Sequence, residues 1–130
     1  MILTAAATCL ALNIFFEGRG EDLMGKVAIA EVTMNRVESP KHPDNICAVV
    51  WDKKQFSWTH DGKHDDPTRF KAKVDRIAWR DSQLIAQMVI DNEISLDVKG
   101  ATHYHADYVE PYWAKHHTML FKLGTHIFYK

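Results

Sequence analysis

The segment Phe15–Glu21, with the sequence FFEGRGE, lies between two apolar runs that are typical of helices. It places the carboxyl group of Glu17 at the end of the first run, beside aromatic rings and before two glycines. Apolar surroundings disfavour the charged form of a carboxyl group and raise its pKa. A glutamate that is protonated near neutral pH can donate a proton to a leaving group, so Glu17 is the first candidate for a general acid.

The runs on either side of this segment predict helices over residues 3–16 and 21–37. Acidic residues at Glu21 and Asp22 suit the N-terminus of the second helix, and we assign Glu21 to that structural role. A third helix is predicted over residues 69–92, and residues 41–50 are predicted to form a loop. The apolar positions expected to face the core are Leu23, Val27, Ala30, Met34 and Val37 in the second helix, and Val74, Ile77, Ala78, Leu84, Ile85, Met88 and Val89 in the third.

The last third of the chain changes from helical to strand-like patterns. Residues 102–105, 119–121 and 125–129 are predicted to be strands, with a turn at Leu123–Gly124 between the last two. The sequence therefore predicts one α+β domain over residues 1–130, which is rich in helix and has a small antiparallel sheet toward the C-terminus.

The overall composition excludes some classes of partner. The net charge of −1 and the pI near 6.7 argue against binding to nucleic acid or to an anionic membrane surface. The apolar run at residues 2–16 is too short to span a bilayer and has no basic segment before it, so we expect neither membrane insertion nor a signal peptide. We expect a monomer.

Two cysteines and eight histidines raise the question of thiol and metal chemistry. Cys9 and Cys47 match no metal motif, and we interpret them as two free thiols in a reducing compartment, with a single disulfide as the alternative. The histidines His103, His105, His116, His117 and His126 could supply zinc ligands, but their spacing is not distinctive and no HExxH motif is present. We therefore expect no metal and no cofactor.

Several motifs in order resemble one protein family along nearly the whole chain. EGRGE at 17–21 resembles the E-A-R-G-E motif of bacterial cell-wall hydrolases of the SleB/CwlJ type, which include spore-cortex-lytic enzymes and phage relatives. The further matches are GKVAIAEVTMNRV at 25–37 to G-Q-x-A-V-A-x-V-x-x-N-R-V, QFSW at 55–58 to Q-F-S-[FW], GATHYHA at 100–106 to G-A-T-x-[FY]-[HY], PYW at 111–113, and GTHIFY at 124–129.

The resemblance implies a fold similar to lytic transglycosylases and lysozyme-like domains. It also implies cleavage of the β-1,4 bond between N-acetylmuramic acid and N-acetylglucosamine in the glycan strands of peptidoglycan. The first glutamate of the motif is the catalytic acid of the family, and this role carries over to Glu17. In the transglycosylase reaction one glutamate acts first as acid and then as base, and the product has a 1,6-anhydro-muramic end.

The aromatic and polar residues of the matched motifs are the candidates for a groove that binds the glycan. They are Gln55, Phe56, Ser57, Tyr104, His105, Trp113, His126 and Tyr129. His126 and Tyr129 are the weaker candidates, because a C-terminal hairpin can simply support the groove. Asn35 and Arg36 match the family pattern, but we expect them to be structural. Ser57 has no G-x-S-x-G context and is not expected to be a nucleophile.

The chain departs from the family pattern in ways that bear on its role. Gly18 stands in place of the usual alanine, and we expect it to loosen the turn after Glu17. The absence of a signal peptide and of a wall-binding domain resembles a phage endolysin, which is made in the cytoplasm and acts on the wall after release. Two other functions remain open: a metal-dependent amidase that uses the histidines, and a wall-binding module without catalysis.

Overall fold

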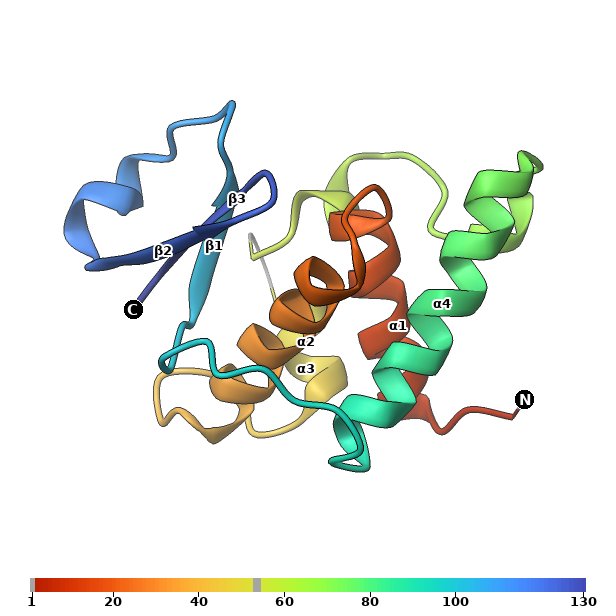
Figure 1. Ribbon diagram of the computed structural model, residues 1–130, viewed down its shortest axis with the longest axis horizontal. Coiled ribbons are helices and arrows are strands. Elements are labelled where there is room, and N and C mark those ends of the chain that lie inside the picture. The colour runs from red at the N-terminus through yellow and green to blue at the C-terminus, as the bar shows by residue number, and fades with distance from the viewer. Residues whose placement is uncertain (1, 53–54) are drawn as a thin grey trace.

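The computed structural model describes residues 2–52 and 55–130, in which helices gather at one end and a small sheet lies at the other (Figure 1). The α-helices are α1 (Ala5–Gly18), α2 (Leu23–Glu38), α3 (Ile46–Val50) and α4 (Lys73–Ile90). Short 3₁₀ helices are η1 (Ser57–His60), η2 (Pro67–Arg69) and η3 (Tyr112–His116), and the strands are β1 (His103–Ala106), β2 (Met119–Leu123) and β3 (His126–Tyr129). The helix-rich α+β class predicted from the sequence is confirmed.

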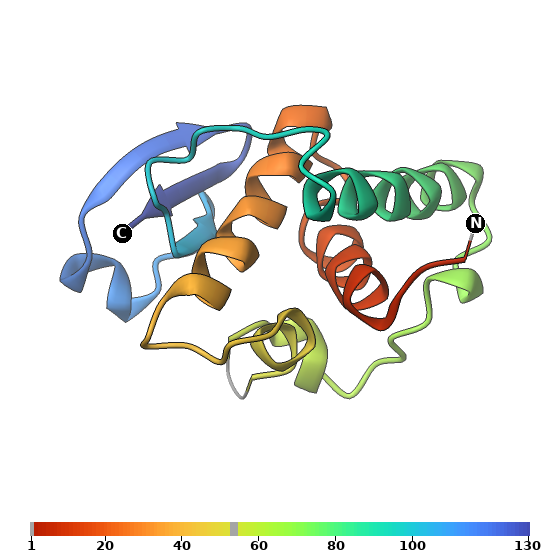
Figure 2. The ribbon, with the colours of Figure 1, turned by 90° about the horizontal axis from the view of Figure 1, so that it is seen from below.

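Helix α1 is the centre of the helical part. It packs against α2, α3 and α4, and its buried residues include Leu10, Ala11, Ile14 and Phe15. Burial of these apolar side chains is the main source of stability for such a core. Both views place α2 between α1 and the sheet (Figures 1 and 2). No helix in the described part of the chain is both long enough and apolar enough to cross a bilayer.

Side-chain caps explain where the first three helices begin. Thr4, Asp22 and Asn45 each accept a hydrogen bond from the backbone N–H three residues later, at the start of α1, α2 and α3. The cap of α2 is therefore Asp22, and the prediction that Glu21 serves the start of this helix is wrong. Glu21 lies just before the helix, where its carboxylate faces another part of the chain.

The three strands form an antiparallel sheet in the order β1-β3-β2. Tyr104 pairs with Phe128 across β1 and β3, and an irregularity interrupts the pairing of β2 with β3 between Met119 and Phe121. Helix α2 holds the start of β1, because Asn35 Nδ2 donates to the carbonyl of Ala101 at 2.9 Å. The predicted structural role of Asn35 agrees with this bond.

The turn between β2 and β3 is held to the start of α2 by Glu21. The backbone N–H and the hydroxyl of Thr125 donate to Glu21 Oε1 at 3.1 and 2.5 Å, and His126 Nδ1 lies 2.6 Å from the same oxygen. Gly124 has a φ of +59°, and a Cβ there would lie 2.3 Å from Glu21 Oε2. Glycine is therefore required by both the backbone conformation and the close carboxylate.

The cysteines correct a second prediction. Cys9 of α1 and Cys47 of α3 form a disulfide, with their Cα atoms 5.3 Å apart. The interpretation as free thiols depended on the lack of a cysteine framework, but the packing of α3 on α1 brings the two residues together. Because structural disulfides persist in oxidising compartments, the predicted reducing environment loses its basis.

Candidate active site

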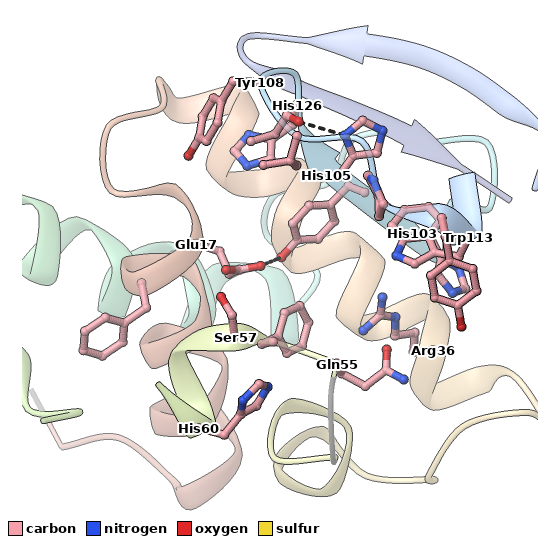
Figure 3. A pocket seen from close by; sticks show the side chains of 17 residues that line it. Glu17, Arg36, Gln55, Ser57, His60, His103, His105, Tyr108, Trp113 and His126 are labelled. Carbon is pink, nitrogen blue, oxygen red and sulfur yellow. Dashed lines mark hydrogen bonds between the residues drawn. The ribbon is translucent and has the colours of Figure 1, made fainter. Parts of the chain in front are cut away.

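A cleft of about 800 Å³ lies between the helical part and the sheet. Figure 3 shows Glu17 on one wall, Gln55, Ser57 and His60 on a second, and His103, His105 and Trp113 on the sheet side, with Arg36 between the last two groups. The full lining is Phe16, Glu17, Arg36, Gln55, Phe56, Ser57, His60, His103, Tyr104, His105, Ala106, Tyr108, Val109, Pro111, Tyr112, Trp113 and His126. A cleft of this size suits a drug-sized ligand or a few sugar rings.

Glu17 is the acidic group of this cleft. It is in the last turn of α1, and no other aspartate or glutamate belongs to the cleft lining in the described chain. Burial raises its pKa from 4.5 to about 6, although a hydrogen bond from Tyr104 and the charge of Arg36 act in the opposite direction. Desolvation therefore dominates, as expected from the apolar surroundings of the segment.

Tyr104 of β1 holds the Glu17 carboxyl group across the cleft. Its hydroxyl donates to Glu17 Oε1 at 3.0 Å, which is the dashed line beside Glu17 in Figure 3. Burial raises the pKa of this phenol well above its usual range, so the hydroxyl stays neutral and remains a donor. Because Oε1 already accepts this bond, Oε2 is the oxygen left to carry a proton toward a ligand.

His126 supports Tyr104 from the side. Its ring packs edge-on against the Tyr104 ring, with the centroids 5.4 Å apart, and its Nδ1 contacts Glu21. The contacts of Glu21 with Thr125 and His126 lower its pKa against the effect of burial. Through the His126 ring, Glu21 therefore orients Tyr104, which in turn contacts Glu17. Glu21 itself does not line the cleft.

The segment after Glu17 is fixed by Arg19. Its guanidinium lies over the rings of Phe15 and Phe70, at 4.9 and 4.4 Å from their centroids, and is 3.6 Å from Asp75 of α4. Gly18 is still helical, and a Cβ there would lie 2.4 Å from Cδ1 of Ile29 in α2. The expected loosening of the turn is wrong, because Gly18 is needed for close packing of two helices.

The second wall is built on an aromatic stack. The rings of Phe16 and Trp58 stack at 4.9 Å, and Trp58 Nε1 donates to Oδ1 of the buried Asn13 at 2.8 Å. These contacts fix η1 beside the end of α1, where Ser57 and His60 face the cleft.

The histidines are distributed among separate contacts. His105 bonds through Nε2 to the hydroxyl of Tyr129 at 2.8 Å, and His103 bonds to the hydroxyl of Thr102 at 3.0 Å. Burial, together with the charge of Arg36 and two neighbouring imidazoles, lowers the pKa of His103 to about 4, so this ring is neutral at neutral pH. Within residues 2–52 and 55–130, no three His, Cys, Asp or Glu side chains have the arrangement of a metal site.

Eight predicted site residues line the cleft: Glu17, Gln55, Phe56, Ser57, Tyr104, His105, Trp113 and His126. Arg36, which was expected to be structural, and His103, which was named only as a possible zinc ligand, line it as well. The other predicted residue, Tyr129, lies behind His105 and does not line this cleft. The cleft residues that were not predicted include Tyr108 and Tyr112, which are highly exposed; Tyr112 is the central residue of the matched PYW motif.

The sequence of this chain matches that of a known protein family. Residues 20–129 match the sequence profile described as Cell Wall Hydrolase. The chain belongs to this cell wall hydrolase family. Glu17 lies just outside the matched range, so its position rests on the structure and on the EGRGE motif.

Curated relatives are spore cortex-lytic enzymes. One from Halalkalibacterium halodurans is 29% identical over 92% of this chain and 33% of its own length, and one from Bacillus cereus is 27% identical over 93% and 42%. The chain thus spans about a third to two fifths of these relatives.

Two solved structures share the fold of this cell wall hydrolase. The catalytic domain of the germination-specific lytic transglycosylase SleB from Bacillus anthracis has a TM-score of 0.71 and 25% identity, and covers 99% of this chain and 97% of its own. The catalytic domain of the Bacillus cereus SleB protein has a TM-score of 0.64 and 23% identity over 99% and 93%. The fold is therefore that of the SleB catalytic domain.

Proposed function

We propose that this cell wall hydrolase is a peptidoglycan lytic transglycosylase that cleaves the β-1,4 bond between N-acetylmuramic acid and N-acetylglucosamine. The observation that carries the proposal is Glu17, a carboxyl group with a pKa raised to about 6, which is the single acidic residue of the described cleft lining. The similarity to a SleB catalytic domain, which is described as a lytic transglycosylase, supports the same reaction.

The first step needs Glu17 as an acid. The protonated Oε2 donates its proton to the glycosidic oxygen, and the bond between that oxygen and C1 of the muramic residue breaks. The acetamido oxygen of the same sugar stabilises the positive charge that develops at C1, as in substrate-assisted glycosidases. A second carboxylate is then unnecessary, which agrees with the cleft lining.

The second step uses the same residue as a base. The Glu17 carboxylate removes the proton from the 6-hydroxyl of the muramic residue, and the oxygen of that hydroxyl bonds to C1. A 1,6-anhydro ring closes, no water is consumed, and Glu17 returns to its protonated state. The Tyr104 hydroxyl contributes by stabilising the carboxylate between the two steps, since a hydrogen bond to the charged form favours it.

The role of Glu17 is tested with a matched pair of variants. Glu17→Gln should abolish lysis of purified peptidoglycan and keep the fold. Glu31→Gln is the control, because Glu31 is also a partly buried glutamate with a raised pKa but does not line the cleft. The proposal fails if Glu17→Gln lyses peptidoglycan as fast as Glu31→Gln does.

The biological role that we propose is that of a phage endolysin, which acts on the wall after release from the cytoplasm. The Cys9–Cys47 disulfide supports action outside a reducing compartment. Expression of the chain in bacterial cells should cause lysis only when a holin permeabilises the inner membrane. Lysis of equal speed without the holin would contradict this role.

A further inference from the structure

Arg36 is a buried cation on the cleft wall whose hydrogen-bonding capacity is mostly unused. The side chain comes from α2, and the residue is only 3% exposed. Its Nε donates to the carbonyl of Thr102 at 2.6 Å, which accounts for one edge of the guanidinium. Nη1 is buried and has no acceptor among residues 2–52 and 55–130, and the guanidinium lies over the ring of Phe56 at 5.1 Å.

No carboxylate in the described chain lies within ion-pairing distance of Arg36. Burial lowers the pKa of Arg36, and Tyr104, Glu17 and Asp52 oppose this effect from longer range. When Glu17 is protonated to act as an acid, it is neutral and no longer offsets the charge of Arg36. A buried charge without a partner is costly, and such a cost is typical of a site whose partner arrives with the ligand.

The histidines near Arg36 add no positive charge to this part of the cleft at neutral pH. His103 and His42 have lowered pKa values because of burial and because of Arg36 itself, so both rings are neutral at neutral pH. Figure 3 shows Arg36 between Gln55 and His103, on the far side of the cleft from Glu17. Among the described residues that line the cleft, Arg36 is the one arginine or lysine that a ligand extending from Glu17 meets.

We propose that Arg36 binds an oxygen of the lactyl carbonyl group, the substituent that distinguishes muramic acid from glucosamine. This inference rests on the proposed function, because it assigns a specificity site within the same cleft. The lactyl group is a carboxylate in a strand without peptide stems and an amide carbonyl under a stem. A guanidinium fork suits both acceptors, and suits the carboxylate best.

The test compares three soluble strands of equal length on the wild-type enzyme. The first has free lactyl carboxylates, the second has peptide stems, and the third has lactyl groups reduced to alcohols. The first strand should show a kcat/KM that is about 10- to 100-fold higher than the third, the value of one charge-assisted hydrogen bond. Activity on the stem-bearing strand as high as on the first shows recognition of the carbonyl, and activity only on the first shows recognition of the charge.

Two variants separate recognition from support of the fold. In Arg36→Gln the preference for the first strand over the third should disappear. Asn35→Ala is the matched control, because Asn35 holds the neighbouring carbonyl of Ala101 from the same helix but does not line the cleft. This control should lower stability and keep the preference.

Three results are decisive. Equal wild-type kcat/KM on all three strands overturns the assignment of Arg36, even if Arg36→Gln cannot be folded. A preference that survives in Arg36→Gln overturns it as well. If cleavage depends on Glu17 and gives anhydro ends but shows no preference, only the Arg36 inference fails, whereas cleavage by Glu17→Gln refutes the proposed function.

Discussion

Replacing Glu17 by glutamine should stabilise the folded protein above pH 7 while it abolishes lysis. In the folded protein the pKa of Glu17 is about 6, against an ordinary value of 4.5. The folded state therefore holds this proton more tightly than the unfolded state. As pH rises from 4.5 to about 6 the free energy of unfolding falls, and at about 1.4 kcal/mol for each pH unit the loss reaches about 2 kcal/mol.

Glutamine cannot ionise and still offers an oxygen to the Tyr104 hydroxyl, so the variant avoids this loss. The free energy of unfolding is measured by urea denaturation of both proteins at pH 4 and at pH 8, with the disulfide intact. The free energy of unfolding of the variant minus that of wild type should be about 2 kcal/mol larger at pH 8 than at pH 4. The reasoning is refuted if the difference between the two proteins is the same at both pH values.

Other changes follow from the same contacts. Tyr104→Phe removes a hydrogen bond that favours the catalytic carboxylate, so the alkaline limit of the pH–rate profile should rise by about one pH unit; an unchanged profile would contradict the contact. Gly18→Ala forces a Cβ against Ile29 and should cost about 1 to 3 kcal/mol, and Ile29→Val should recover most of this loss in a double-mutant cycle. Failure of the second change to rescue the first would show that the two residues are not coupled. Replacing both cysteines by serine should lower the free energy of unfolding by about 4 kcal/mol, as expected for a closed loop of this length, whereas a loss near zero would mean that the disulfide has little effect on the unfolded chain.

The long elements and the motif positions could be predicted from the sequence because they have strong local signals. The glycines and the aromatic pair around Glu17 predicted a carboxyl group with a raised pKa, and its pKa of about 6 follows from burial. The helix α3 was missed, because five residues cannot show a helical period. That omission also hid the disulfide, since α3 brings Cys47 to α1.

It was harder to predict which residues of each helix face the core. Leu23 and Val74, expected in the core, are 52% and 71% exposed, whereas Lys26 and Arg36 are almost fully buried. Helix α2 lies between α1 and the sheet, so it is buried around most of its circumference and one apolar stripe does not describe it. The partners of Glu21 lie more than a hundred residues away, and no local pattern reveals such a contact.

The role of Gly18 also depends on a distant residue. The resembled family pattern has alanine at this position and valine where this chain has Ile29. The extra methyl group of Ile29 occupies the place that a Cβ at position 18 would need. Gly18 of α1 therefore leaves room for the side chain of Ile29 in α2, and sequence reasoning on one position alone could not recognise this contact.

The most direct test of the central claim is mass spectrometry of the fragments that wild type and Glu17→Gln release from purified peptidoglycan. Wild type should release fragments with 1,6-anhydro-muramic ends, which are one water molecule lighter than hydrolysis products, and the variant should release none. Reducing muramic ends from the wild type, or anhydro ends released by the variant, would contradict the role of Glu17 as acid and then base.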